Sequence, residues 1–239
     1  MQVELFIPCF IDQLYPQTAR NLVRLLERVG LEVFYNREQT CCGQMAFNSG
    51  YWEETRVLGE KLVKELAGNR LVVGPSASCI SMIKNYYPDL FHNSSLHLQY
   101  RQLQQNIREV SDFLVNTLQI TDVGAVFPHK VTYHDACAAL REYGIREEPR
   151  ALLAKVGGLE LIEMEESDTC CGFGGTFAVK NEPISIAMGQ QKLEFAVATG
   201  AEYIISTEAS CLMHLQGIID KQKLPIKTIH LVDVLASGW

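Results

Sequence analysis

Eight cysteines occur in two matching sets of four, and thiols in such numbers point to metal or redox chemistry. The first set contains Cys9, Cys41, Cys42 and Cys79, and the second contains Cys137, Cys170, Cys171 and Cys211. Counted by intervening residues, the spacings are C-x31-CC-x36-C and C-x32-CC-x39-C, which together use every cysteine of the chain. Four converging thiolates can hold a zinc ion, an iron–sulfur cluster or a dithiol/disulfide redox centre.

The adjacent pair in each set favours an iron–sulfur cluster among these three. Neighbouring residues usually point their side chains apart, whereas the ligands of one tetrahedral zinc ion are commonly two to four residues apart. A multi-iron cluster is wider and offers different metal atoms to two adjacent sulfurs. A vicinal disulfide would be strained and would leave the other two thiols of its set unused. We therefore expect all eight cysteines to be metal ligands.

Other residues near the cysteines are candidates for supporting roles. Glycines follow each pair and let the backbone pass close enough to donate N–H groups to a cluster; they are Gly43, Gly172, Gly174 and Gly175. His134 and His214 lie three residues from Cys137 and Cys211, and each is either a ligand or proton donor of the site or a hydrogen-bonded structural group. Arg141 is either a surface cation or a counter-charge for an anionic cluster. The segment GFGG lacks the G-x-G-x-x-G spacing of a dinucleotide site.

The elements that carry the two sets occur in the same order. The first half is expected to contain strands at 3–8, 31–35 and 70–74, and helices at 17–30 and 53–68. The second half is expected to contain strands at 130–136, 159–164 and 202–206, and helices at 147–158 and 184–200. Alternating strands and helices predict an α/β fold of two tandem Rossmann-like lobes with parallel sheets, related by a pseudo-twofold internal repeat. The predicted lobes are residues 1–121 and 122–239.

This arrangement should bring each set of four thiols together. The loops at the carboxyl ends of parallel strands meet in one crevice, and the cysteines follow predicted strands. Cys79 and Cys211 also open short helices, whose free N–H groups favour the thiolate. Asp112 and Asp233 lie at matching points before an apolar helix. Residues 88–105 have no counterpart in the second half and are expected to form a surface insertion.

Composition restricts the class of protein. The chain has 239 residues, 47% of them hydrophobic, which is enough for a core without disulfide bonds. A net charge of -7 and the absence of any block of Lys or Arg argue against a nucleic-acid partner. No stretch reaches the roughly 18 apolar residues of a transmembrane segment, and the N-terminus lacks the basic region of a secretory signal. We expect a cytoplasmic protein.

The repeated pattern of a single cysteine, a distant CCG and a further cysteine resembles the CCG cysteine-rich domain family. Members of this family include the cysteine-rich subunit of heterodisulfide reductase and the iron–sulfur subunit of glycolate oxidase. The segments IPCFIDQLYPQTA and CCGFGGTFAVKNEPIS are most similar to the lactate utilization protein A family. That resemblance implies a cytoplasmic iron–sulfur protein that acts with partner proteins in the oxidation of L-lactate to pyruvate.

The sequence departs from the longer family motif at one position in each half. Where the motif has a fifth cysteine, this chain has Met82 and His214. Four cysteines per lobe suffice for one 4Fe-4S cluster, and zinc in one or both sites is the alternative. We hypothesise an electron-transfer subunit of a 2-hydroxyacid oxidising complex that needs its other subunits for catalysis. The alternatives are a heterodisulfide-reductase-like thiol/disulfide catalyst and a zinc-stabilised interaction module without enzymatic activity.

Overall fold

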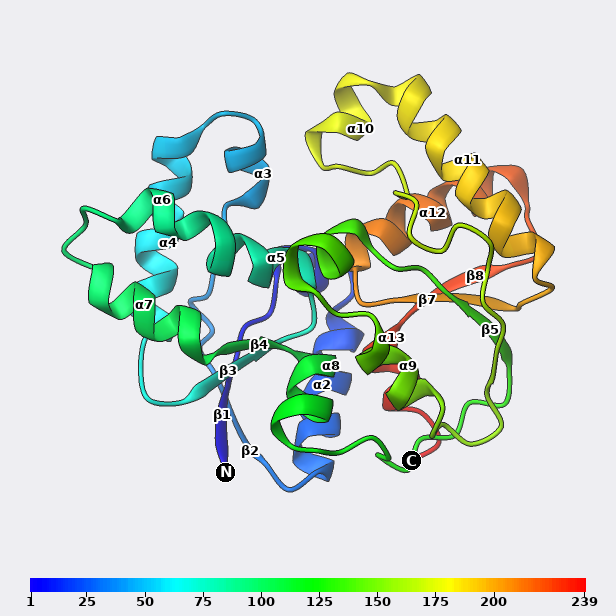
Figure 1. Cartoon of the computed structure of the whole chain (residues 1–239), viewed down its shortest axis with the longest axis horizontal. Coiled ribbons are helices and arrows are strands. Elements are labelled where there is room, and N and C mark those ends of the chain that lie inside the picture. The colour runs from blue at the N-terminus through cyan, green and yellow to red at the C-terminus, as the bar shows by residue number, and fades with distance from the viewer.

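Two four-stranded parallel sheets lie side by side in the computed structural model, which describes residues 1–239 (Figure 1). The first sheet has the order β2-β1-β3-β4, with strands Gln2–Leu5 (β1), Glu32–Tyr35 (β2), Leu71–Gly74 (β3) and Ile107–Glu109 (β4). The second has the order β6-β5-β7-β8, with strands Lys130–Tyr133 (β5), Glu160–Leu161 (β6), Tyr203–Ser206 (β7) and Lys227–His230 (β8). The matching order confirms the predicted α/β fold with an internal repeat.

Helices connect and cover the strands of each sheet. The elements from β1 to η2, here called the first lobe, include α1 (Cys9–Leu14), α2 (Pro16–Arg28), α3 (Gln44–Asn48), α4 (Trp52–Leu66), α5 (Ala77–Ser81), η1 (Met82–Tyr86), α6 (Tyr87–Phe91), α7 (His97–Asn106), α8 (Val110–Asp112) and η2 (Phe113–Thr117). The elements from β5 onward, the second lobe, include η3 (Ala138–Tyr143), α9 (Glu147–Leu153), α10 (Thr176–Lys180), α11 (Glu182–Ala198), α12 (Ala209–Gln222) and α13 (Leu231–Leu235). No helix is both long and apolar enough to cross a membrane.

Local sequence explains where most of these helices begin and end. In α2 the buried residues Leu22, Leu25 and Leu26 form one face, Pro16 occupies the first turn, and Gly30 follows the helix with a φ of 84°. The predicted helix at 147–158 is wrong at its carboxyl end. The chain leaves α9 after Leu153 because residue 157 pairs with the segment before β5: its N–H donates to Ala125 O at 2.9 Å.

The edge strands and the insertion at 88–105 depend on contacts between residues that are distant in the sequence. The strands β4 and β8, which precede the apolar helices, complete the edge of each sheet and were not predicted. The insertion at 88–105 contains most of α6 and α7, but the prediction that it is a surface segment is only half right. Phe91, Tyr100 and Leu103 are fully buried, and they join the core cluster that contains residues of α4.

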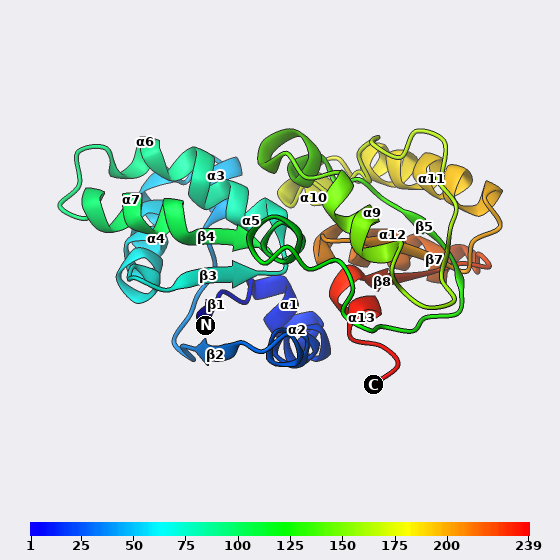
Figure 2. The same cartoon turned by 60° about the horizontal axis from the view of Figure 1, so that its bottom comes forward.

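The lobes share a core and exchange hydrogen bonds across their interface. One apolar cluster contains residues of β1 and α2 together with residues of β5, α9 and α13, and Figure 2 shows α13 beside α2. Asp112 of the first lobe accepts a hydrogen bond from the Tyr143 hydroxyl at 2.6 Å. Asp233 of the second lobe accepts hydrogen bonds from Thr18 and Asn21 at 2.7 and 2.8 Å. The predicted boundary at residue 121 falls in the connection between η2 and β5 and stays a prediction.

A buried carboxyl group near this interface makes stability depend on pH. Glu109 is fully buried; its Oε2 accepts hydrogen bonds from the Ser111 and Asp112 backbone N–H groups, while Oε1 has no partner. Burial raises the pKa of Glu109 from 4.5 to about 8. Between these values the folded protein holds a proton that the unfolded chain has lost, so stability falls as the pH rises through this range.

Replacement of this residue, Glu109→Gln, should remove that pH dependence, because the amide mimics the protonated acid. We expect the free energy of unfolding of the variant, relative to wild type, to rise by a few kcal/mol between pH 5 and pH 9, since one pKa unit is worth about 1.36 kcal/mol. Urea denaturation of both proteins at several pH values measures this difference. A difference that stays constant with pH would contradict the assignment.

Candidate metal centre

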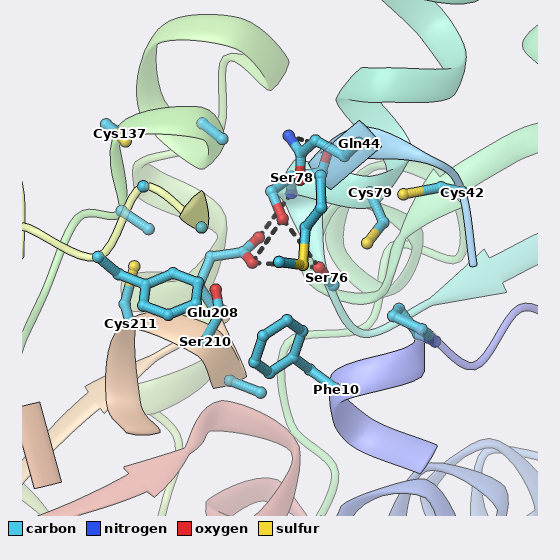
Figure 3. Close-up of a pocket in the computed structure, with 18 of the residues that line it drawn as sticks. Phe10, Cys42, Gln44, Ser76, Ser78, Cys79, Cys137, Glu208, Ser210 and Cys211 are labelled. Atoms are coloured by element: carbon cyan, nitrogen blue, oxygen red, sulfur yellow. Dashed lines mark hydrogen bonds between the residues drawn. The ribbon is translucent and has the colours of Figure 1, made fainter. Parts of the chain in front are cut away.

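All eight cysteines line one cavity between the two lobes, with a volume of about 180 Å³. Figure 3 shows Cys42 and Cys79 on one side of it and Cys137 and Cys211 on the other, with Glu208 between them. The cysteines reach this place because they follow the carboxyl ends of parallel strands, which point towards the same crevice. The sequence thus predicted that the thiols of each set converge. It did not predict that the two sets face a common cavity.

The thiols of each set lie close together. In the first set, Cys9 Sγ lies 3.6 Å from Cys41 Sγ, and Cys42 and Cys79 line the same cavity. In the second set, Cys171 Sγ and Cys211 Sγ lie within 4.8 Å of each other, and Cys137 and Cys170 line the cavity beside them. Each set thus presents four adjacent sulfur donors.

The turn after each pair stabilises one thiolate. The backbone N–H of Gly43 donates to Cys41 Sγ at 3.3 Å, and that of Gly172 donates to Cys170 Sγ at 3.4 Å. Hydrogen bonds from Cys42, Cys9 and the Gly43 N–H lower the pKa of Cys41 to about 3. Hydrogen bonds from neighbouring thiols, with the Gly172 N–H, likewise lower the pKa of Cys170 to about 2. Thiolate is the form that binds metal.

Both turns require glycine. Gly43 and Gly172 have φ values of 82° and 92°, and each packs against the second helix after its turn, α4 or α11. A Cβ atom on Gly172 would lie 2.5 Å from the Ser185 carbonyl oxygen of α11, and one on Gly43 would lie 2.9 Å from a methyl group of Thr55 in α4. Gly174 and Gly175 line the cavity before α10, but their backbone N–H groups donate to no sulfur, so their predicted cofactor role stays a prediction.

His134 lies at the second set with no hydrogen-bond partner. Its side chain is fully buried, and neither ring nitrogen is paired. A ring nitrogen, Cys171 Sγ and Cys211 Sγ all lie within 4.8 Å of one another. Burial lowers the pKa of His134 to about 3, so the imidazole is neutral and can donate one hydrogen bond and accept another. An orphaned buried imidazole beside thiols fits an occupant that the protein alone does not supply.

The other two candidates beside the second set already have protein partners. His214 Nε2 lies 3.3 Å from the Ser185 carbonyl oxygen and 3.4 Å from its hydroxyl, and His214 does not line the cavity. Arg141 donates to the Asp168 carbonyl oxygen at 3.1 Å, which braces the loop before Cys170. Met82, at the position that matches His214 in the first lobe, is fully buried.

Two charged residues at the site were missed in the sequence. Glu208 is buried between the lobes, and its carboxylate accepts hydrogen bonds from the Ser76 hydroxyl at 3.1 Å and from the Ser78 N–H at 2.6 Å. Lys192 is 1% exposed and donates to the Glu166 and Ser167 carbonyl oxygens at 2.6 and 2.8 Å. Two features of the sequence could have indicated them. Lys192 lies on the inward face of the predicted helix at 184–200, and Glu208 stands where the first half has Ser76.

The donor set fits an iron–sulfur cluster or a zinc ion. Each lobe offers four sulfur donors and no carboxylate among them, and soft thiolate ligation selects these metals over hard cations. The glycine N–H groups aimed at sulfur are the outer hydrogen bonds that tune such sites. Cys9, Cys41, Cys42 and Cys79 would hold the metal of the first lobe, and Cys137, Cys170, Cys171 and Cys211 that of the second.

Known proteins match the whole chain. The Cysteine-rich domain family, CCG, matches twice, at residues 3–84 and 131–216. A lactate utilization protein A from Exiguobacterium sp. is 41% identical over 239 residues, covering 99% of this chain and 97% of the relative. Proteins of the same name from Halalkalibacterium halodurans and Geobacillus thermodenitrificans are 41% and 40% identical, each covering 98% of this chain and 96% and 98% of the relative.

A solved structure supports the fold. A hypothetical protein from Helicobacter pylori superposes with a TM-score of 0.65 at 12% identity, covering 100% of this chain and 49% of the other. At that identity the likeness concerns the backbone alone. Two lobes in this arrangement thus occur in a larger protein of different sequence.

Proposed function

The chain belongs to the lactate utilization protein A family of CCG cysteine-rich domain proteins, and we propose that it is the iron–sulfur electron-transfer subunit of a cytoplasmic, multi-protein system that oxidises L-lactate to pyruvate. Lactate utilization is the role that the names of its relatives carry. The observation that supports electron transfer is the pair of four-thiol sets that face one cavity.

Different residues of the chain would have different roles in electron transfer. The eight cysteines would hold one 4Fe-4S cluster per lobe, and bound clusters supply the acceptance and release of single electrons. Gly43 and Gly172 orient the vicinal pairs and donate N–H groups to sulfur. Glu208, Ser76 and Ser78 fix the spacing of the two lobes across the cavity. Lobes that share a core keep the two sites at a constant separation.

Partner proteins complete the reaction. Oxidation of lactate releases two electrons and two protons, and a flavin or nicotinamide normally takes the hydride first. We assign that acceptor to another subunit, because the sequence has no dinucleotide fingerprint. The chain would then pass on the two electrons one at a time. The purified chain alone should not oxidise lactate, and addition of its partner proteins should restore dye reduction by lactate; appreciable lactate oxidation by the chain alone would overturn the proposed role.

Metal analysis of the anaerobically purified chain tests the cofactor. We expect about eight iron atoms and about eight sulfides per chain, with visible absorption that dithionite bleaches. Stoichiometric zinc without a visible band would favour an interaction module stabilised by metal. Turnover of a disulfide substrate by the chain alone would instead favour thiol/disulfide catalysis, for which the unpaired His134 ring could donate a hydrogen bond.

A further inference from the structure

The two sets of cysteines have the same arrangement, but the first has apolar neighbours at positions where the second has polar or charged ones. Phe6 and His134 occupy equivalent positions, because each follows the first strand of its sheet and pairs with the neighbouring strand. The Phe6 N–H donates to Val73 O at 3.0 Å, and the His134 N–H donates to Ile205 O at 2.8 Å. An apolar ring in the first lobe thus corresponds to an imidazole in the second.

A second equivalent pair lies on the helices that cover the CCG turns. Thr55 of α4 and Ser185 of α11 are matched, because each packs against the glycine of its own CCG turn. Seven residues further along these helices are Leu62 and Lys192, and both side chains are buried. A leucine in the first lobe thus corresponds to an ammonium group in the second.

The third pair follows the last cysteine of each set. Met82 lies three residues after Cys79, and His214 lies three residues after Cys211. The three residues of the first lobe, Phe6, Leu62 and Met82, are fully buried and belong to the same apolar cluster as Cys42. The surroundings of the first set therefore offer neither a positive charge nor a side-chain hydrogen-bond donor at these positions.

Two of the corresponding residues of the second lobe, His134 and Lys192, lie beside its thiols or the loop that carries them. The His134 ring lies within 4.8 Å of the sulfurs of Cys171 and Cys211, and the buried Lys192 ammonium donates to the hydroxyl of Thr169, the residue before Cys170, at 3.3 Å. Lys192 also holds the loop that leads to Cys170, through the carbonyl oxygens of residues 166 and 167. Hydrogen bonds to sulfur and nearby positive charge stabilise the reduced, more negative state of an iron–sulfur cluster.

We propose that the cluster of the second lobe has the higher reduction potential. An electron that enters the chain would then reside mainly on the cluster beside His134 and Lys192. The proposal rests on the proposed function, because it requires a cluster in each lobe. It assigns a direction to the chain: partner proteins that donate electrons should do so through the first lobe, and acceptors should take them from the second.

Two single-site proteins test this order. Cys41→Ala with Cys42→Ala leaves only the second site, and Cys170→Ala with Cys171→Ala leaves only the first. Each protein is purified anaerobically, its iron and sulfide are counted, and its reduction is followed by EPR in an equilibrium titration with mediator dyes. A reduced dye loses one electron and the cluster gains it, while no bond of the protein forms or breaks. We expect the second site to be reduced more readily by at least tenfold in the equilibrium constant, which is 59 mV for one electron.

Substitutions in the protein that retains the second site identify the cause. Lys192→Met and His134→Phe should each disfavour reduction by about tenfold, whereas Lys221→Met, at an exposed lysine of α12, should leave the potential unchanged. If Lys192→Met fails to retain iron, His134→Phe decides. Equal potentials, a first site that is reduced more readily, or potentials that neither substitution moves would overturn the proposal. Absence of iron and sulfide from both single-site proteins would instead contradict the proposed function.

Discussion

The substitutions Cys42→Ala and Cys171→Ala, at the buried thiol of each pair, should each lower the iron content from about eight to about four atoms per chain. Both side chains are nearly inaccessible to solvent, and each variant leaves its lobe with three of its four cysteine sulfurs. Lactate-dependent dye reduction by the complete system should fall by more than about a hundredfold, because even the outer partners of metal ligands are worth 10–100-fold. Iron and sulfide analysis and the assay measure both effects.

A variant in the same cavity controls for the change of size and polarity. Ser210 precedes Cys211 and lines the cavity, but it carries no thiol. The variant Ser210→Ala should keep its full iron content and activity. Full iron content in Cys171→Ala would show that this thiol is not a ligand, and loss of all iron from either cysteine variant would show that the two sites do not fill independently.

The substitution Gly172→Ala should destabilise the protein by about 3 kcal/mol. A φ of 92° destabilises the fold by about 1 kcal/mol or more when the residue has a side chain. The new Cβ would also lie 2.5 Å from the Ser185 carbonyl oxygen and 2.9 Å from Met188 Cβ, and overpacking of this kind costs about 1–3 kcal/mol. For a chain of this length, a loss of 3 kcal/mol corresponds to a decrease in Tm of roughly 6–12 °C, which circular dichroism can measure.

Gly200→Ala is the matched control in the same lobe. Gly200 also has a positive φ, 71°, but a Cβ atom there would meet nothing within 4 Å. The substitution Gly200→Ala should therefore lower the free energy of unfolding by only about 1 kcal/mol, the conformational cost of the positive φ. The two positions share a positive φ and differ chiefly in packing, so similar losses of stability would show that the contact between the CCG turn and α11 does not constrain the site.

The parts of the fold that local sequence determines could be predicted, and those that depend on distant contacts could not. The spacing of Leu22, Leu25 and Leu26 specifies α2, and the repeated order of elements around the cysteines specifies two similar lobes. The strands β4 and β8 are short edges that form only when a neighbouring strand is present. The burial of Tyr100 in the insertion likewise depends on residues of α4 far away in the sequence.

The same distinction applies to the site. The positions of the eight cysteines after strands were enough to expect that each set converges, because strand ends in a parallel sheet share one edge. Glu208 could not be found in this way, because its partners Ser76 and Ser78 belong to the other lobe. The burial of Lys192 against backbone carbonyl groups was also hidden, because those carbonyls lie in a loop without a periodic pattern.

The crosswise contacts of the lobes, in which Asp112 is held by Tyr143 and Asp233 by Thr18 and Asn21, have the form of a self-complementary dimer interface. In a homodimer of one such lobe, both sites would have to carry identical residues, and a change that suited one would be imposed on the other. Joining the halves in one polypeptide removes that constraint. Phe6 and His134 can then differ at equivalent positions, and either site can change without the other.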